Sequence, residues 1–196
     1  MHHFRITKCD PQFRHEKTGA FMRDEWTGAG QIGETFVDGV LTESEYRRVE
    51  GLYASALRLL WMESGQPTLQ IQALETSVHF GLPAQLPTLD DVGFGGWRPE
   101  NGEFIPGAQL LEAVVRWCLR EFGWCQLVAP GFYVTFGYDF YMYVGTTDFV
   151  GSARRAITSS GLFVEQCPPH GPKGPPKIFA YSPPELVNAW WITIMS

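Results

Sequence analysis

The stretch WCQLVAPGFYVTFGYDFYMYV, residues 124–144, decides the fold. It contains three short runs rich in aromatic and β-branched residues, and the turn-forming segments APG (129–131) and GYD (137–139) separate them. Runs of this composition are typical of strands, and glycine and proline between them favour tight turns. The stretch therefore predicts hairpin-connected strands over residues 124–128, 132–136 and 140–144.

The last of these runs has aromatic residues on both faces. Side chains alternate across a strand, so Phe140 and Met142 should lie on one face and Tyr141 and Tyr143 on the other. If helices cover only one face, the two tyrosines lie on the opposite face, and tyrosine is favoured at protein interfaces because it is large, stiff and amphipathic. The sequence leaves open the alternative that helices cover both faces.

The clearest helix is predicted over residues 42–64. Apolar residues recur there every three or four positions, which indicates one buried stripe. Thr42 and Glu45 have the spacing of a capping box, in which each side chain accepts from the other residue's backbone N–H. Gly65 follows the last apolar residue and is expected to end the helix.

Outside these segments the sequence predicts shorter elements and two irregular stretches. The stretch 10–39 should wrap onto the core, and the Gly- and Pro-rich stretch 79–107 is either a functional loop or contains elements that the pattern does not reveal. A second helix, apolar over a wide face, is expected over 106–122, and short helices are expected over 152–160 and from 182. Strands are expected over 4–8, 69–73 and 162–166, and an edge strand over 178–181. The apolar anchors of the stretch 10–39 are Phe21, Trp26, Ile32 and Phe36.

These elements predict one α+β domain spanning residues 1–196. We expect a mixed or antiparallel sheet of about five to six short strands, packed with two main helices and one or two short helices. A chain of this length buries enough surface for a core of its own. Its composition, 44% hydrophobic and 18% charged, is that of a globular protein.

The net charge is −6, and it is unevenly distributed. Residues 64–145 contain eight acidic and three basic residues. Nucleic-acid binding needs clustered Lys and Arg, so the balance argues against it. An acidic surface is compatible with a basic protein partner, although a modest negative charge also serves solubility alone.

Several features predict a cytoplasmic protein that binds no membrane. No apolar run is long enough to span a bilayer, and the first residues lack the order of a signal peptide. The four cysteines are scattered in a chain too large to need disulfides, so reduced thiols in a reducing compartment are expected. These four are Cys9, Cys118, Cys125 and Cys167.

No catalytic, metal-binding or cofactor motif is apparent. The segment GFGGW (93–97) lacks the Lys-Ser or Lys-Thr pair of a phosphate-binding loop and is interpreted as a turn. Cys118 lies on an apolar helix face and Cys125 begins a strand, so Cys9 and Cys167 are the better candidates for a nucleophile, although neither has a visible base. The histidines His2, His3, His15, His79 and His170 have no Cys, Asp or Glu at the spacing of a metal site.

Carboxylates in loop-like sequence are the candidate binding groups. They are interpreted as part of a surface that faces a basic patch on another protein, together with the aromatic residues noted above. Solvated loop acids, or a pair of carboxylates with catalytic roles, are the alternatives. The candidate partner-binding residues are Asp24, Glu25, Asp38, Asp90, Asp91, Trp97, Glu100, Glu103, Tyr141 and Tyr143, with Glu34 as a further acidic residue.

Six short strings resemble a family of bacterial polymorphic-toxin immunity proteins: FRITK (4–8), RDEWT (23–27), QIG (31–33), LTESEY (41–46), FYMY (140–143) and GLFVE (161–165). The resemblance implies a cytosolic protein that binds a cognate toxin domain and blocks it by stoichiometric occlusion. It implies no enzymatic activity and no cofactor, and it identifies no functional residues.

Two other function classes stay open at this stage. The chain could be an enzyme or small-molecule-binding protein with a pocket under the 79–107 loop, where His79, Asp90 or Asp91 would supply the polar groups. A structural or scaffold protein would instead expose an apolar patch and self-associate. The sequence leaves the oligomeric state undetermined.

Overall fold

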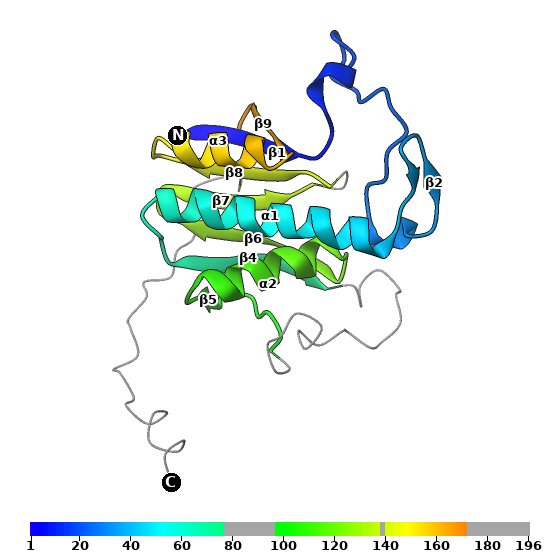
Figure 1. Ribbon diagram of the computed structural model, residues 1–196. Coiled ribbons are helices and arrows are strands. Elements are labelled where there is room, and N and C mark those ends of the chain that lie inside the picture. Colours follow the sequence, from blue (N-terminus) through cyan, green and yellow to red (C-terminus); the bar gives the residue numbers. More distant parts are fainter. Residues whose placement is uncertain (77–96, 138–139, 172–196) are drawn as a thin grey trace, which may run out of the picture.

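The computed structural model describes residues 1–76, 97–137 and 140–171. Within these residues the protein forms a seven-stranded antiparallel sheet in the order β5-β4-β6-β7-β8-β1-β9, and three α-helices lie on one of its faces (Figure 1). A second sheet has two strands. The strands are β1 (His2–Thr7), β2 (Thr35–Phe36), β3 (Gly39–Val40), β4 (Leu69–Thr76), β5 (Phe104–Ile105), β6 (Gly123–Ala129), β7 (Phe132–Phe136), β8 (Met142–Thr146) and β9 (Phe163–Gln166). The α-helices are α1 (Glu43–Glu63), α2 (Ala108–Leu119) and α3 (Gly151–Ser159), and the 3₁₀ turns are η1 (Pro11–Phe13) and η2 (Ala29–Gln31).

The α+β fold class is confirmed, with more strands than the five to six expected. The additional strands lie in or at the end of the two stretches that were expected to be irregular: β2 within 10–39, β3 at the end of that stretch, and β5 within 79–107. Each has only two residues, so no alternation of apolar and polar residues marks it. The edge strand expected over 178–181 and the helix expected from residue 182 lie outside the described residues.

Helix α1 begins where the capping signal predicts. Thr42 Oγ1 accepts a hydrogen bond from the Glu45 backbone N–H at 3.1 Å. The predicted capping box is formed only in this half, because the Glu45 carboxylate binds Arg48 on the next turn, at 2.7 and 2.8 Å, and not the Thr42 backbone N–H. Gly65 has a φ of 76°, a conformation that favours glycine and ends the helix. None of the described helices is both long and apolar enough to cross a membrane.

Helix α3 is fixed to the end of α1 by a side chain. The Glu63 carboxylate of α1 accepts hydrogen bonds from the backbone N–H groups of Ser152 and Ala153 at 3.1 and 2.5 Å. These amides have no partner within their own helix, and a carboxylate also complements the positive end of the helix dipole. The contact therefore caps α3 and docks it on α1 in one step.

The two faces of the sheet differ as the alternation in 140–144 predicts. Met142 and Val144 are fully buried on the helix-covered face. Tyr143 pairs with Arg5 in register and points to the opposite face, where Arg5 also lies over the ring of Tyr141. Among the described residues the helices thus cover one face, and Tyr143 on the other face is only 9% exposed because the ring of His170 stacks on it at 4.0 Å.

Phe140 departs from the predicted strand and joins the core. Its φ is 57°, so β8 begins only at Met142. The ring of Phe140 lies 5.0, 5.8 and 5.1 Å from the rings of Trp26, Tyr46 and Tyr53, all in tilted or edge contacts. Such geometry is the favoured one for aromatic pairs. A positive φ is uncommon outside glycine, and here it accompanies the placement of the ring among three others.

Tyr53 adds two hydrogen bonds to this aromatic cluster. Its hydroxyl donates to the Phe140 carbonyl at 2.7 Å and accepts from the Lys8 backbone N–H at 2.8 Å. The phenol is fully buried, so both bonds are shielded from water. One side chain of α1 therefore holds the end of β1 and the turn between β7 and β8 together.

Residues 10–42 leave the sheet and pass over the first turns of α1, and we call this segment the arch (Figure 1). Trp26 anchors it in the core, as predicted, and Phe36 packs against the core with part of its surface exposed. Phe21 packs at 6.5 Å against Phe13 within the arch itself. The prediction for Ile32 is wrong, because its side chain is exposed.

We expect the substitution Tyr53→Phe to lower the free energy of unfolding by about 1–3 kcal/mol. It removes the partner of the part-buried N–H of Lys8 and of the buried carbonyl of Phe140. Tyr46→Phe is the matched control, because the Tyr46 hydroxyl makes one such bond, to the Leu119 carbonyl. Chemical denaturation measures both, and a Tyr53→Phe protein as stable as the wild type would contradict the role of this hydroxyl.

Alkaline pH should act through the same residue. Burial raises the pKa of Tyr53 well above its ordinary value. A raised pKa in the folded state contributes stability that is complete below the unfolded-state pKa of about 10 and is lost as the pH rises beyond it. The free energy of unfolding should therefore fall above about pH 10, and less steeply in Tyr53→Phe than in the wild type. Denaturation curves across this pH range test this, and identical slopes would refute it.

Candidate functional site

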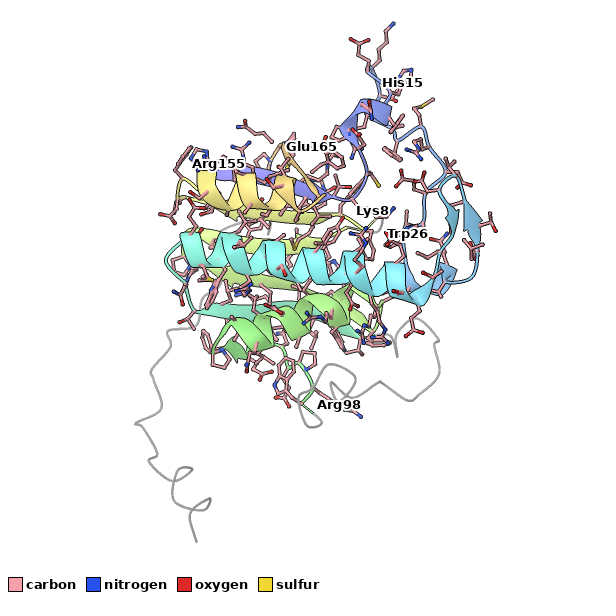
Figure 2. The ribbon with its side chains drawn as sticks, in the orientation of Figure 1. Lys8, His15, Trp26, Arg98, Arg155 and Glu165 are labelled. Atoms are coloured by element: carbon pink, nitrogen blue, oxygen red, sulfur yellow. The ribbon has the colours of Figure 1, made fainter. Side chains whose placement is uncertain are left out.

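A cavity of about 440 Å³ lies beneath the arch. Its walls come from four places in the chain: the end of β1, the arch, the first turns of α1 and the turn between α3 and β9. Figure 2 shows Lys8 and Trp26 between the arch and α1. The volume falls within the usual range of small-molecule sites.

An ion pair with little exposure forms part of the cavity wall. Lys8 Nζ lies 2.9 Å from Glu25 Oε2, and the two side chains are 8% and 14% exposed. The same ammonium group lies 4.2 Å from the ring centroid of Trp26, in a cation–π contact. Removing one partner of such a desolvated pair is costly, because the other charge then stays uncompensated. The pair therefore joins the arch to the end of β1.

The other two cations of the cavity are also paired. Arg23 binds Asp38 at 2.8 Å, lies 3.8 Å from Glu25 and covers the ring of Phe13 at 4.5 Å. At the α1 side, Arg48 binds Glu45, and this contact lowers the pKa of the Glu45 carboxyl. The cavity thus has three cations, each with a carboxylate partner, and aromatic rings between them.

The outer surface of the arch has a different character. Its large apolar side chains are exposed: Met22 by 65%, Val37 by 64%, Val40 by 56% and Ile32 by 40%. Asp24, Glu34 and Asp38 are exposed on the same segment, which contains six acidic and three basic residues in all. Exposed apolar residues on one segment among carboxylates are a common mark of a protein-binding surface.

On the face of the sheet opposite the three described helices, Tyr141 and Tyr143 belong to a charged cluster. Arg5 and Arg14 both bind the Glu165 carboxylate, at 3.0 and 3.3 Å. Arg14 also donates to the Tyr141 hydroxyl at 3.2 Å, and the two tyrosine rings meet edge to face at 6.3 Å. This cluster connects the base of the arch to β9, so Tyr141 has a structural role in addition to any role in binding.

The candidate partner-binding residues fall into separate places. The arch brings together Asp24, Glu25 and Asp38, and the face of the sheet opposite the described helices brings together Tyr141 and Tyr143. Trp97, Glu100 and Glu103 precede β5, and Figure 2 places the adjacent Arg98 far from His15 of the arch. Asp90 and Asp91, and with them His79 and most of the pocket expected under 79–107, lie outside the described residues.

Several of these residues have internal partners. Trp97 Nε1 donates to Glu103 Oε1 at 2.6 Å, and Glu103 also accepts from the Glu100 backbone N–H. Glu25 is paired with Lys8. Asp24 and Asp38 are the candidates that the structure leaves exposed on the arch.

Of the residues that line the cavity with Glu25, the sequence singles out Asp38 as a candidate binding residue and Trp26 and Phe36 as apolar anchors. It assigns no binding role to Lys8 or Arg23, which occur only in the strings FRITK and RDEWT and in the predicted strand and irregular segment. The structure identifies both cations by their aromatic neighbours: Lys8 lies over the ring of Trp26, and Arg23 lies over the ring of Phe13. A tryptophan within a polar, glycine-containing stretch is the one local signal that marks the site in advance.

The cysteines and histidines make no comparable site among the described residues. No group of three or more His, Cys, Asp and Glu side chains there is arranged to hold a metal ion. Cys118 and Cys125 are buried with their sulfurs 3.7 Å apart, and burial raises the pKa of Cys118. Burial also raises the pKa of Cys9 and Cys167, which opposes thiolate formation at neutral pH.

Comparisons with known proteins add no relative from which a function could be transferred. No protein-family model matches the chain, and no curated protein or solved structure is similar to it. The resemblance to immunity proteins thus stays a prediction, and the arch and its cavity are interpreted from their own geometry.

Proposed function

We propose that this chain is an immunity-type protein, which binds a basic toxin domain through the outer surface of the arch and blocks it by stoichiometric occlusion. The observation that carries the proposal is the exposed surface of Met22, Ile32, Val37 and Val40 among the carboxylates of the arch. Burying such side chains against a partner contributes the main favourable free energy of association. The acidic residues around them favour a partner of opposite charge.

The arch supports this role because it is held in place before any partner binds. Trp26 fixes its middle in the core, and the Lys8–Glu25 pair fixes it to β1. Its outer hairpin is closed by hydrogen bonds from the Gly33 N–H to the Leu41 carbonyl and from the Leu41 N–H to the Glu34 carbonyl, at 2.8 and 2.9 Å. A surface ordered in advance loses less conformational entropy on binding.

Charge supports a basic partner. The chain has a net charge of −6, and the arch has twice as many acidic as basic residues. Opposite charges accelerate diffusional encounter, and fast capture is what an inhibitor of a toxin needs. In this proposal the protein acts in the cytoplasm, where its four cysteines stay reduced.

Co-expression with the product of the neighbouring gene tests the proposal. We expect a complex of fixed stoichiometry that survives gel filtration at physiological salt, and rescue of growth when that product is toxic. Ile32→Asn and Val37→Asn should each weaken binding by about tenfold or more, because burying an isoleucine or a valine contributes roughly 1.5–3 kcal/mol. Isothermal titration calorimetry measures the change.

Phe149→Asn is the matched control for these variants. Phe149 is 78% exposed but lies next to α3, outside the arch, so its substitution should leave binding unchanged. Two results would oppose the proposal: elution of the two gene products as separate proteins, or equal loss of affinity in the arch variants and in the control.

A further inference from the structure

The cavity beneath the arch shares Asp38 and Val40 with the surface that we assign to a protein partner, but Met22, Ile32 and Val37 of that surface do not line it. It has a wall of its own, formed by the Lys8–Glu25 pair, Arg23 and the rings of Phe13, Trp26 and Phe36. Its volume of about 440 Å³ leaves room for a small organic molecule. The question is which charge and shape such a ligand would have.

The charges of the cavity select a ligand that carries both signs. Lys8, Arg23 and Arg48 are each matched with a carboxylate, so the wall is close to neutral. The fourth carboxylate, Asp10, is occupied in capping η1 through the Gln12 backbone N–H. A ligand with a single charge would place that charge in a partly desolvated site without compensation, which is unfavourable. A zwitterion brings its own compensation.

The wall also has donors and acceptors for both ends of a zwitterion. An ammonium group has three N–H donors, and Lys8 donates one of them to Glu25. Arg23 has donors beyond the one that binds Asp38. Glu25 and Asp38, beside these cations, can accept from a ligand ammonium group. Cations and carboxylates thus alternate along the wall.

The remaining wall is apolar. The rings of Phe13, Trp26 and Phe36 line the cavity from the arch, and Leu52 and Leu162 line it from α1 and from the turn before β9. Apolar and aromatic lining contributes most of the binding free energy in small-molecule sites, while a few polar groups fix the orientation. The ligand should therefore combine a zwitterionic end with an apolar or aromatic body.

We propose that the cavity binds a free α-amino acid with an apolar or aromatic side chain. Its carboxylate lies by Lys8 and Arg23, its ammonium group by Glu25 and Asp38, and its side chain against the rings of the arch. The site lies between the arch and α1, so a bound ligand adds contacts between them.

Titration of the full chain with small probes tests this proposal. L-phenylalanine and L-leucine represent the ligand, hydrocinnamate has only the carboxylate, and phenethylamine has only the ammonium group. We expect saturable binding of the amino acids, at least about tenfold tighter than binding of either singly charged analogue. Nuclear magnetic resonance should locate the shifts at the methyl groups of Leu52 and Leu162.

Arg23→Gln should weaken the binding of L-phenylalanine, and Arg47→Gln is the matched control. Arg47 lies on the exposed side of α1, paired with Glu43 and outside the cavity wall. Any of three results overturns the proposal. The amino acids give no saturable binding signal up to their solubility limits, a singly charged analogue binds with equal affinity, or the chemical shifts change only at residues away from the cavity. The methyl shifts keep the test valid even if Arg23→Gln alters the arch.

Discussion

The hydroxyl of Tyr53 and the ring of Phe140 hold together the parts of this protein that are distant in sequence. Tyr53 comes from α1, Phe140 from the turn before β8, and the hydroxyl joins that turn to the end of β1 at Lys8. Trp26 of the arch closes the cluster at 5.0 Å from Phe140. Because the ring of Trp26 packs where α1 meets the sheet, the packing of α1 on the sheet sets the position of the arch.

The arch consequently has two surfaces with different chemistry. Its outer side exposes apolar residues and carboxylates, its inner side encloses paired charges and rings, and Asp38 and Val40 belong to both. Both proposals, a docking surface for a basic protein and a site for a zwitterionic amino acid, depend on an arch that keeps its shape. The Lys8–Glu25 pair is shared between them, since it anchors the outer surface and lines the inner one.

The sequence predicts the regular part of this fold better than the site. Periodicity and capping identify α1 and the hairpin strands, because those signals are local. It misses β2, β3 and β5, which are two residues long, and it misplaces Ile32, whose side chain is 40% exposed. The cavity forms where Lys8, Arg23 and α1 meet in space. Contacts between residues so far apart in the sequence leave no periodic pattern in it.

Amide hydrogen exchange in the wild type and in Trp26→Ala tests most directly whether the arch is a fixed surface. Trp26 is the buried anchor of the arch, while the sheet and α1 keep their own core without it. The account predicts that the amides of Gly33 and Leu41, hydrogen-bonded in the hairpin, are protected in the wild type and lose protection in the variant, while those of β7 and β8 keep theirs. Unprotected Gly33 and Leu41 amides in the wild type, or unchanged protection in Trp26→Ala, would contradict it.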